Sequence, residues 1–201
     1  MNVNERIRAA EERLRGLFDK IDEIALFNQE KVLKAFQEER IALRHFLPST
    51  GYGYGDEGRD TLGRVYARTF GAERAIVSPA LLSGTHALTV ALFGVLRPSD
   101  RVLCITDMPY DTIRGVIWGK GNGSLAEFGV FFDVLDLNGN GKTDFSAVRR
   151  ALSEKKYRMI YIQRSRGYEL RDAFTVDEIG EMCAFVRENG FQGCIFVDNC
   201  Y

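Results

Sequence analysis

Residues 157–199, YRMIYIQRSRGYELRDAFTVDEIGEMCAFVRENGFQGCIFVDN, decide the fold. Two short apolar runs, at 157–163 and 194–199, enclose residues 175–190, in which apolar side chains recur at helical spacing. Short runs rich in Val, Ile and Phe that alternate with amphipathic helices are typical of parallel strands covered on both faces. This stretch therefore predicts a strand–helix–strand unit of an α/β protein.

The same alternation extends toward the N-terminus. Residues 101–107 (RVLCITD) and 128–137 (FGVFFDVLDL) are predicted strands, and residues 83–96, 111–119 and 145–154 are predicted helices. The sequence thus predicts a parallel-rich sheet between helices. Because the chain stops directly after the strand at 194–199, where a covering helix normally follows, we expect this domain to be incomplete at its C-terminus.

The N-terminal part has a different character. Residues 4–46 show helical periodicity, with Asn28 as a candidate break into two helices. Pro48 ends this pattern, and the turn-rich segment STGYGYGDEGRD follows before a helix resumes at residue 60. We therefore expect an N-terminal helical segment with a Gly/Tyr loop (1–58) and a partial ligand-binding domain (59–201).

Composition narrows the function classes. Of 201 residues, 27 are Lys or Arg and 28 are Asp or Glu, so the sequence predicts neither a nucleic-acid nor a membrane-surface partner. The charged N-terminus has no apolar signal region, and no stretch approaches the length of a membrane span. The four cysteines lack CxxC spacing, which favours free thiols in a cytoplasmic protein over metal or disulfide sites.

Residues 136–144 (DLNGNGKTD) imitate the start of a calcium-binding EF-hand loop. The twelfth position would be Ala147, where the loop requires a bidentate glutamate. The preceding residues are also strand-like, whereas an EF-hand begins after a helix. We therefore predict a Gly/Asn turn here and no metal site.

Polar and aromatic residues follow several of the apolar runs, at the carboxyl ends of the predicted strands. In open parallel sheets, ligands bind beyond the carboxyl ends of the strands. We therefore expect the site to draw on these residues: Ser83, Gly84, Thr85, His86; Asp107, Met108, Pro109, Tyr110; Gln163, Arg164, Ser165, Arg166; Asp198 and Asn199.

Each of these groups has a functional and a structural interpretation. Ser83-Gly84-Thr85 opens a helix and could bind a phosphate, but Ser and Thr are also the usual N-cap residues. Asp198 ends an apolar strand, where its carboxylate could keep a pyridine nitrogen protonated or could form a cap or salt bridge.

Aromatic and cationic residues leave the same choice open. Tyr110 could stack on a planar ligand or be a core or surface tyrosine. Arg164 and Arg166 could bind a carboxylate or be solvated loop residues. Tyr52 and Tyr54, between glycines, suit a ligand or subunit contact as well as a plain turn.

Four segments together resemble a known family: residues 50–88 (TGYGYGDEGRDTLGRVYARTFGAERAIVSPALLSGTHAL), 107–113 (DMPYDTI), 162–168 (IQRSRGY) and 197–201 (VDNCY). The family is the methionine γ-lyase-like proteins often labelled aluminium-resistance proteins, and the resemblance covers nearly the whole chain, from about Phe18 to Tyr201. These belong to the cysteine/methionine-metabolism group of pyridoxal-phosphate enzymes. The resemblance implies the large domain of the aspartate-aminotransferase fold (fold type I) and pyridoxal 5'-phosphate as cofactor.

The resemblance also implies roles for individual residues. Ser83, Gly84 and Thr85 would hold the cofactor phosphate, Tyr110 would stack on the ring as a catalytic residue, and Asp198 would pair with the pyridine nitrogen. Gln163 would lie near the ring hydroxyl, and Arg164 or Arg166 would meet the carboxylate of an amino-acid substrate. Tyr52 or Tyr54 would reach the phosphate of a neighbouring subunit, which implies a homodimer or tetramer.

One departure from the family pattern stands out. The family's Schiff-base lysine lies downstream of the aspartate strand, and Lys120, Lys142, Lys155 and Lys156 all precede it. The resemblance thus implies the N-terminal portion of a carbon–sulfur lyase, which we expect to be inactive as a 201-residue chain. The alternatives are a transaminase or aldolase of the same fold, or a non-catalytic domain that binds a phosphate ligand.

Overall fold

The computed structural model describes residues 2–52 and 54–200, which form two compact units, 1–80 and 81–201. This division lies later than the one predicted from the sequence, between 58 and 59. The reason is that the helix after the Gly/Tyr loop packs on the N-terminal helix and joins its unit. The two units are described separately.

The first unit consists of α1 (Val3–Glu38), a short 3-10 helix (Leu43–Phe46) and α2 (Glu57–Phe70). The sequence places a candidate break at Asn28, but α1 is continuous there. The Asn28 side chain donates to the carbonyl of Ile24, 2.9 Å away, one turn earlier, so it leaves the helical backbone bonds in place. The helix instead ends at Glu38, just before Arg40, whose φ of 52° is left-handed.

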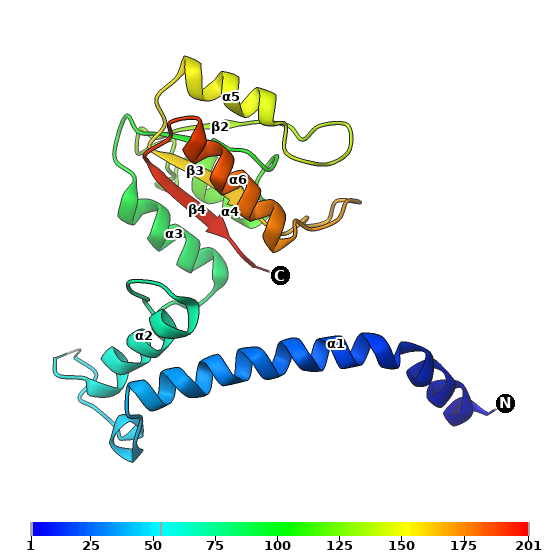
Figure 1. Cartoon of the computed structure of the whole chain (residues 1–201). Helices are drawn as coiled ribbons and strands as arrows, with labels where there is room; N and C mark the ends of the chain where they lie inside the picture. Colours follow the sequence, from blue (N-terminus) through cyan, green and yellow to red (C-terminus); the bar gives the residue numbers. More distant parts are fainter. Residues whose placement is uncertain (1, 53, 201) are drawn as a thin grey trace. The chain divides into compact units, whose positions relative to one another are not determined.

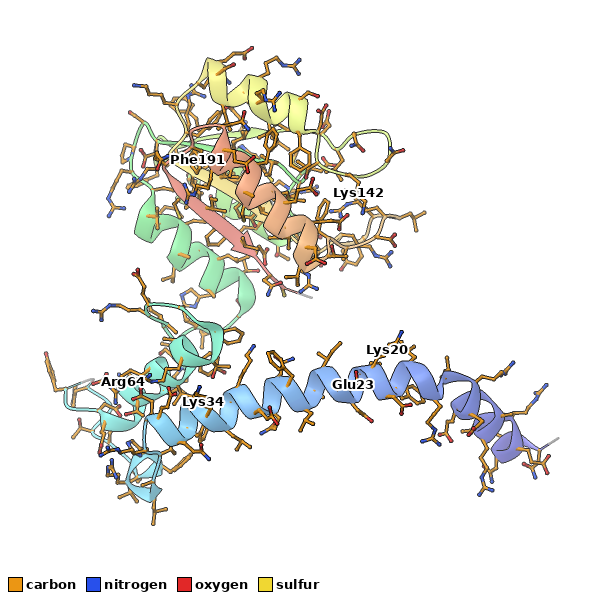
Figure 2. The ribbon with its side chains drawn as sticks, viewed as in Figure 1. Lys20, Glu23, Lys34, Arg64, Lys142 and Phe191 are labelled. Carbon is orange, nitrogen blue, oxygen red and sulfur yellow. The ribbon has the colours of Figure 1, made fainter. Side chains whose placement is uncertain are left out.

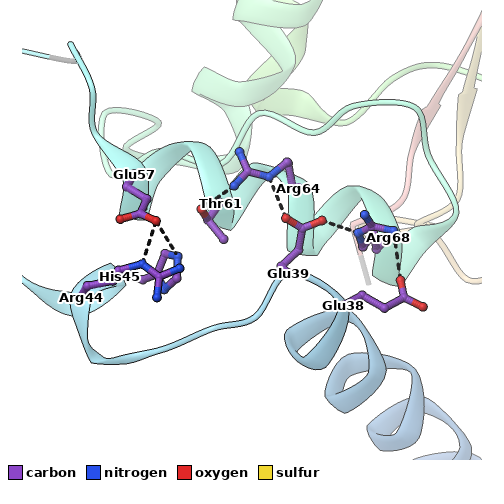
Figure 3. A network of polar contacts seen from close by, with 8 residues as sticks. All are labelled: Glu38, Glu39, Arg44, His45, Glu57, Thr61, Arg64 and Arg68. Carbon is purple, nitrogen blue, oxygen red and sulfur yellow. Dashed lines mark hydrogen bonds and ion pairs between the residues drawn. The ribbon is translucent and has the colours of Figure 1, made fainter.

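A network of charged residues ties the end of α1 to α2 (Figure 3). The carboxylate of Glu39 accepts a hydrogen bond from Arg64 at 2.7 Å and a second one from Arg68. The Glu39 side chain is only 8% exposed, and the hydrogen bonds from Arg64 and then Arg68 hold its pKa below the ordinary value. This pairing makes α2 part of the first unit.

Most of the α1 surface has no partner among the described residues of its unit. Ala35 is its one buried side chain, whereas large apolar residues such as Leu17, Ile21 and Ile24 are at least half exposed. In Figure 2 the side chains of α1, Lys20 and Glu23 among them, project from the helix over most of its length.

The second unit is the predicted α/β domain. Its elements alternate along the chain (Figure 1): α3 (Gly84–Val95), β1 (Arg101–Cys104), α4 (Asp111–Trp118), β2 (Phe131–Val134), α5 (Phe145–Glu154), β3 (Met159–Gln163), α6 (Val176–Glu188) and β4 (Cys194–Asp198). The four strands form one sheet in the order β2-β1-β3-β4, and all three pairings are parallel. The fold class predicted from the sequence is confirmed.

The side-chain alternation of the strands builds a core on each face of the sheet. On one face, Val102, Cys104, Met159 and Tyr161 pack with residues of α3 and α4 such as Leu92 and Ile113. On the other face, Leu103, Ile105, Ile160 and Ile162 pack with residues of α5 and α6 such as Val148 and Met182. Helices therefore cover both faces, as the continuous apolar strands require.

The segment that imitates an EF-hand is the predicted turn. Leu137 and Thr143 form an antiparallel bridge across it. The side chain of Asn138 accepts hydrogen bonds from the backbone N–H groups of Asn140 and Lys142. Asp144 then caps α5 through the N–H groups of Ser146 and Ala147, so these polar side chains are engaged in local backbone bonds.

Over residues 2–52 and 54–200, no helix has the length and apolar character needed to cross a membrane. The same residues contain no group of three or more His, Cys, Asp or Glu side chains placed to hold a metal ion. All four cysteines are free thiols, and burial raises the pKa of Cys104 to about 12.

Candidate functional site

A pocket of about 780 Å³ lies in the second unit, at the carboxyl ends of three strands. Gly84 and Thr85 of α3, Tyr110 after β1, Gln163 at the end of β3 and Asp198 at the end of β4 all line it. The size suits a small-molecule ligand. The structure thus brings together residues that the sequence places more than 100 positions apart.

The position of the pocket follows from the strand order. From β1 the chain moves to β2 on one side of the sheet and then returns to β3 on the other. The connections leaving β1 and β3 therefore diverge, which opens a crevice beyond the carboxyl ends of these two strands. Tyr110 and Gln163 lie at that crevice, and Gln163 is paired in register with Asp198 on β4.

The N-terminus of α3 forms one wall. Gly84 and Thr85 are the first two residues of the helix, so their N–H groups have no carbonyl acceptor within the helix. The helix dipole is also positive at this end. Apart from Gly84 itself, its chain neighbours and the backbone of α3, no atom of the described residues lies within 4 Å of the position that a Cβ on Gly84 would occupy, so the space beside this backbone is open. An anion can approach these N–H groups closely.

Ser83 has the structural role that the sequence left open. Its hydroxyl oxygen accepts the N–H of His86 at 3.1 Å, which makes it the N-cap of α3. Ser83 is not among the residues that line the pocket, unlike Gly84 and Thr85. The Thr85 hydroxyl lies 3.0 Å from the hydroxyl of Thr112, another lining residue.

Asp198 is the buried carboxylate of the site, with 7% of its surface exposed. Burial raises its pKa above the ordinary aspartate value, and hydrogen bonds from the Cys200 N–H and the Tyr161 hydroxyl oppose this effect. These bonds are long, 3.3 Å to Cys200 and 3.4 Å to Tyr161. Asp198 is therefore a desolvated acid with little compensation from the protein around it.

Tyr110 and Gln163 are joined to each other. The backbone N–H of Tyr110 donates to the Gln163 side-chain oxygen at 2.7 Å. The other end of the Gln163 amide donates to the Ser165 carbonyl at 3.0 Å. Gln163 is thus held at both ends, and the Tyr110 ring lies at the pocket wall.

The two candidate arginines differ in their surroundings. Arg164 donates to the Phe174 carbonyl and to the Asn199 side chain, so its guanidinium joins neighbouring segments of the chain. Arg166 is exposed and is the one cationic side chain that lines the pocket among the described residues. One guanidinium nitrogen of Arg166 donates to the Arg171 carbonyl. The other N–H groups of the guanidinium remain as possible donors to a ligand.

Two tyrosines and the lysines are the other residues that the sequence singled out. Tyr52 and Tyr54 belong to the first unit and are 82% and 87% exposed. Lys142 pairs with Glu178 and Lys155 with Asp133. In the described part of the chain, no lysine side chain lines the pocket.

Sequence reasoning gave no role to several residues that the structure places at the site. Thr112, Tyr168 and Cys200 line the pocket, and the Tyr161 hydroxyl donates to the Asp198 carboxylate. Thr112 belongs to the segment DMPYDTI, Tyr168 to IQRSRGY and Cys200 to VDNCY, all quoted for the family resemblance, so a signal was present for these three. Tyr161 lies inside an apolar strand, where a tyrosine has the pattern of an ordinary core residue.

This chain is similar to several known proteins. The sequence model described as methionine gamma-lyase matches residues 3–201. The uncharacterized protein YnbB of Bacillus subtilis (strain 168) is 47% identical over 189 residues, covering 92% of this chain and 45% of YnbB.

Solved structures extend the comparison. A Listeria monocytogenes protein, provisionally described as a cystathionine beta-lyase involved in aluminum resistance, superposes with a TM-score of 0.94 at 47% identity. That match covers 99% of this chain and 51% of the Listeria chain. The chain therefore spans about half the length of these relatives.

A distant structure shares the fold alone. It is provisionally described as an O-acetylhomoserine (thiol)-lyase of Campylobacter jejuni subsp. jejuni NCTC 11168, with N'-pyridoxyl-lysine-5'-monophosphate. It matches with a TM-score of 0.50 at 16% identity, over 71% of this chain and 30% of its own. Because the family's sequence model matches residues 3–201 and two relatives are 47% identical to it, this chain belongs to the methionine gamma-lyase family.

Proposed function

We propose that this chain forms the cofactor-binding part of a pyridoxal 5'-phosphate-dependent carbon–sulfur lyase of amino-acid metabolism. The observation that carries the proposal is the convergence of a helix N-terminus, an aromatic ring and a buried carboxylate on one pocket. Pyridoxal phosphate has one group to match each of them: a phosphate, a planar ring and a ring nitrogen. The residues present therefore fit this cofactor.

The N-terminus of α3 would hold the phosphate. The N–H groups of Gly84 and Thr85 would donate to its oxygens, and the Thr85 hydroxyl would supply another donor. Ser83 would support the phosphate site indirectly, since its hydroxyl oxygen caps the first turn of α3. Positive dipole and unpaired N–H groups at one helix end favour a dianionic ligand.

Asp198 would pair with the ring nitrogen. An isolated buried carboxylate is unfavourable, and a protonated pyridine beside it would supply the missing positive charge. The hydrogen bonds from Tyr161 and Cys200 favour the ionised form of Asp198 that such a pair requires. The ligand would thereby compensate the burial that the protein alone leaves nearly uncompensated.

When bound, the cofactor supplies a ring that accepts electron density from the carbon next to the substrate nitrogen. Tyr110 would lie against that ring and keep water from one face of it. Gln163 would hold the Tyr110 backbone and lie near the ring hydroxyl. Arg166 would bind the carboxylate of the amino-acid substrate at the pocket rim, with Arg164 as a supporting residue of the strand ends.

We further propose that the protein is cytoplasmic and forms a homo-oligomer. Tyr52 and Tyr54 are exposed aromatic residues between glycines, which suits a contact with the cofactor phosphate of a second copy. The relatives' names supply the reaction class, because a cystathionine beta-lyase breaks a carbon–sulfur bond. A role in aluminium resistance rests on those names alone.

Equilibrium dialysis against pyridoxal 5'-phosphate and against pyridoxal tests the cofactor assignment. We expect saturable binding of the phosphate ester at one site per chain and much weaker binding of pyridoxal, since the α3 N-terminus recognises the phosphate. Equal affinity for both compounds would contradict the phosphate site. Absence of any saturable binding would contradict the proposed function.

The reaction class is tested on a relative of greater length, such as YnbB, with pyridoxal phosphate and a sulfur amino acid. Thiol release would support a carbon–sulfur lyase. Transfer of the amino group to a keto acid without thiol release would support the transaminase alternative instead.

A further inference from the structure

The last residue of β3 and the segment that follows it contact Tyr110 at three separate points. The first is the hydrogen bond from the Tyr110 backbone N–H to the side-chain oxygen of Gln163, 2.7 Å long. Gln163 is 4% exposed, and its own backbone N–H donates to the Thr106 hydroxyl at 2.8 Å. A buried, doubly held amide thus fixes the backbone position from which the Tyr110 ring projects.

The second point is the backbone of Gly167, which lies against the ring itself. A Cβ atom added to Gly167 would sit 3.0 Å from Cδ2 and 3.4 Å from Cε2 of Tyr110. Gly167 also has a φ of +59°, a left-handed conformation that side chains disfavour. Glycine therefore allows the chain to approach one edge of the Tyr110 ring without a side chain between them.

The third point is the neighbouring residue, Tyr168. The Tyr110 hydroxyl donates to the Tyr168 hydroxyl at 3.1 Å, and the ring centroids are 5.7 Å apart at an interplanar angle of 38°. Tyr168 is 84% exposed, so burial does not account for its place beside Tyr110. Both tyrosines line the pocket.

We propose that residues 163–168 form a clamp that fixes the Tyr110 ring at the pocket wall, and that Tyr168 is a positioning residue acting through Tyr110. The clamp rests on the proposed function only in assuming that the pocket ligand lies against Tyr110. Its physical benefit is preorganisation, because a ring already held in place loses less side-chain freedom when the ligand binds.

The clamp itself is tested without any ligand, by NMR of the full chain labelled with ¹³Cζ-tyrosine. Tyr110→Phe identifies the Tyr110 signal. We expect Tyr168→Phe and Gly167→Ala each to shift that signal. Gly190→Ala is the matched control, since Gly190 has a φ of +84° but nothing within 4 Å of an added Cβ.

Gly190→Ala should therefore introduce similar backbone strain and leave the Tyr110 signal in place. A Tyr110 signal that is unchanged in Tyr168→Phe would overturn the proposal. Tyr168→Phe alters only an exposed hydroxyl, so this arm does not depend on whether Gly167→Ala folds.

The ligand arm measures the dissociation constant for pyridoxal 5'-phosphate. Tyr168→Phe should weaken binding about two- to tenfold, the value of one neutral hydrogen bond, and should have no further effect in a Tyr110→Phe background. An equal loss in that background would mean that Tyr168 acts on the ligand directly, which overturns the positioning role. Failure of the unaltered chain to bind would instead contradict the proposed function, while the NMR arm still decides the clamp.

Discussion

Replacing Asp198 by asparagine should make the fold more stable and the cofactor site weaker. The carboxylate is 7% exposed, and its hydrogen bonds from Cys200 and Tyr161 are 3.3 and 3.4 Å long. Bonds to a carboxylate are strongest at about 2.7–2.9 Å, so these two compensate its burial only in part. Asparagine keeps the shape of the side chain and removes the charge.

The size of the stability gain follows from that incomplete compensation. Neutral replacements of buried charges are often neutral or stabilising, by about 1–4 kcal/mol. Because Asp198 lies at the wall of an open pocket and keeps two hydrogen bonds, we expect the lower part of that range, about 1–2 kcal/mol at pH 7.

The pH dependence of the unfolding free energy shows whether ionised Asp198 stabilises or destabilises the fold. Burial raises the pKa of Asp198 in the folded state, so between the unfolded and folded pKa values the native chain binds more protons than the unfolded chain. Ionised Asp198 therefore lowers the stability of the fold above its raised pKa, and this effect fades as the pH falls. The difference between Asp198→Asn and the unaltered chain should vanish below about pH 3.9, the ordinary aspartate value.

The effect on the ligand has the opposite direction. Loss of a charge-assisted bond to the ring nitrogen should weaken pyridoxal 5'-phosphate binding about 10- to 100-fold. A gain in stability together with a loss of affinity would identify a residue retained for binding rather than for folding.

Urea unfolding at several pH values measures the stability, and equilibrium dialysis measures the affinity. Asp133→Asn is the matched control in the same sheet. Burial acts to raise the pKa of Asp133, but hydrogen bonds from Lys155 and Tyr157 outweigh it and hold the pKa below its usual range. Asp133→Asn should therefore destabilise the fold at neutral pH, and this loss should shrink as the pH falls through the lowered pKa.

A destabilising effect of Asp198→Asn at pH 7 would refute the reasoning. So would a stability difference that does not change between pH 7 and pH 4, because the effect would then not come from the charge.

Three further predictions concern other parts of the molecule. Glu39→Gln should destabilise the first unit by about 1–2 kcal/mol above pH 5, a value already reduced because the partner arginines are half-exposed. The loss should be smaller at lower pH, since the pKa of Glu39 is lowered in the folded chain. Urea unfolding measures this loss, and Lys34→Gln, a change at an exposed residue, should have little effect. Gly63→Ala should destabilise by about 1–3 kcal/mol because its Cβ would lie 2.9 Å from the Ala75 carbonyl, whereas Gly16→Ala, with open space, should stabilise α1; an equal effect of the two on thermal unfolding would contradict this. Tyr161→Phe should raise the pKa of Asp198 further, as measured by ¹³C NMR titration of the carboxyl, because one of the hydrogen bonds to its ionised form is lost; an unchanged titration would show that this bond is too weak to matter.

The α/β unit could be predicted from sequence because its strands are buried on both faces. Runs such as MIYI (159–162) are apolar at every position, and the helices between them are amphipathic, so strand and helix patterns do not overlap. The crevice could be predicted as well, since parallel strands place their carboxyl ends together.

What the sequence left open depends on contacts between distant residues. Asn28 is compatible with both a break and a continuous helix, and the bond to the Ile24 carbonyl decides for the helix. The N-terminal unit extends past residue 58 because Glu39 accepts from two arginines of α2, a pairing that no local pattern reveals. Tyr168 meets Tyr110 only because Gly167 allows the two segments to approach.

The most direct test of the central claim is a titration of the ¹⁵N-labelled chain with pyridoxal 5'-phosphate, followed by amide NMR. We expect the amide signals of Gly84, Thr85, Arg166 and Cys200 to shift together with a single dissociation constant, and Asp198→Asn to weaken this response. Shifts confined to residues around the exposed lysines, or no shifts at the α3 N-terminus, would contradict the account.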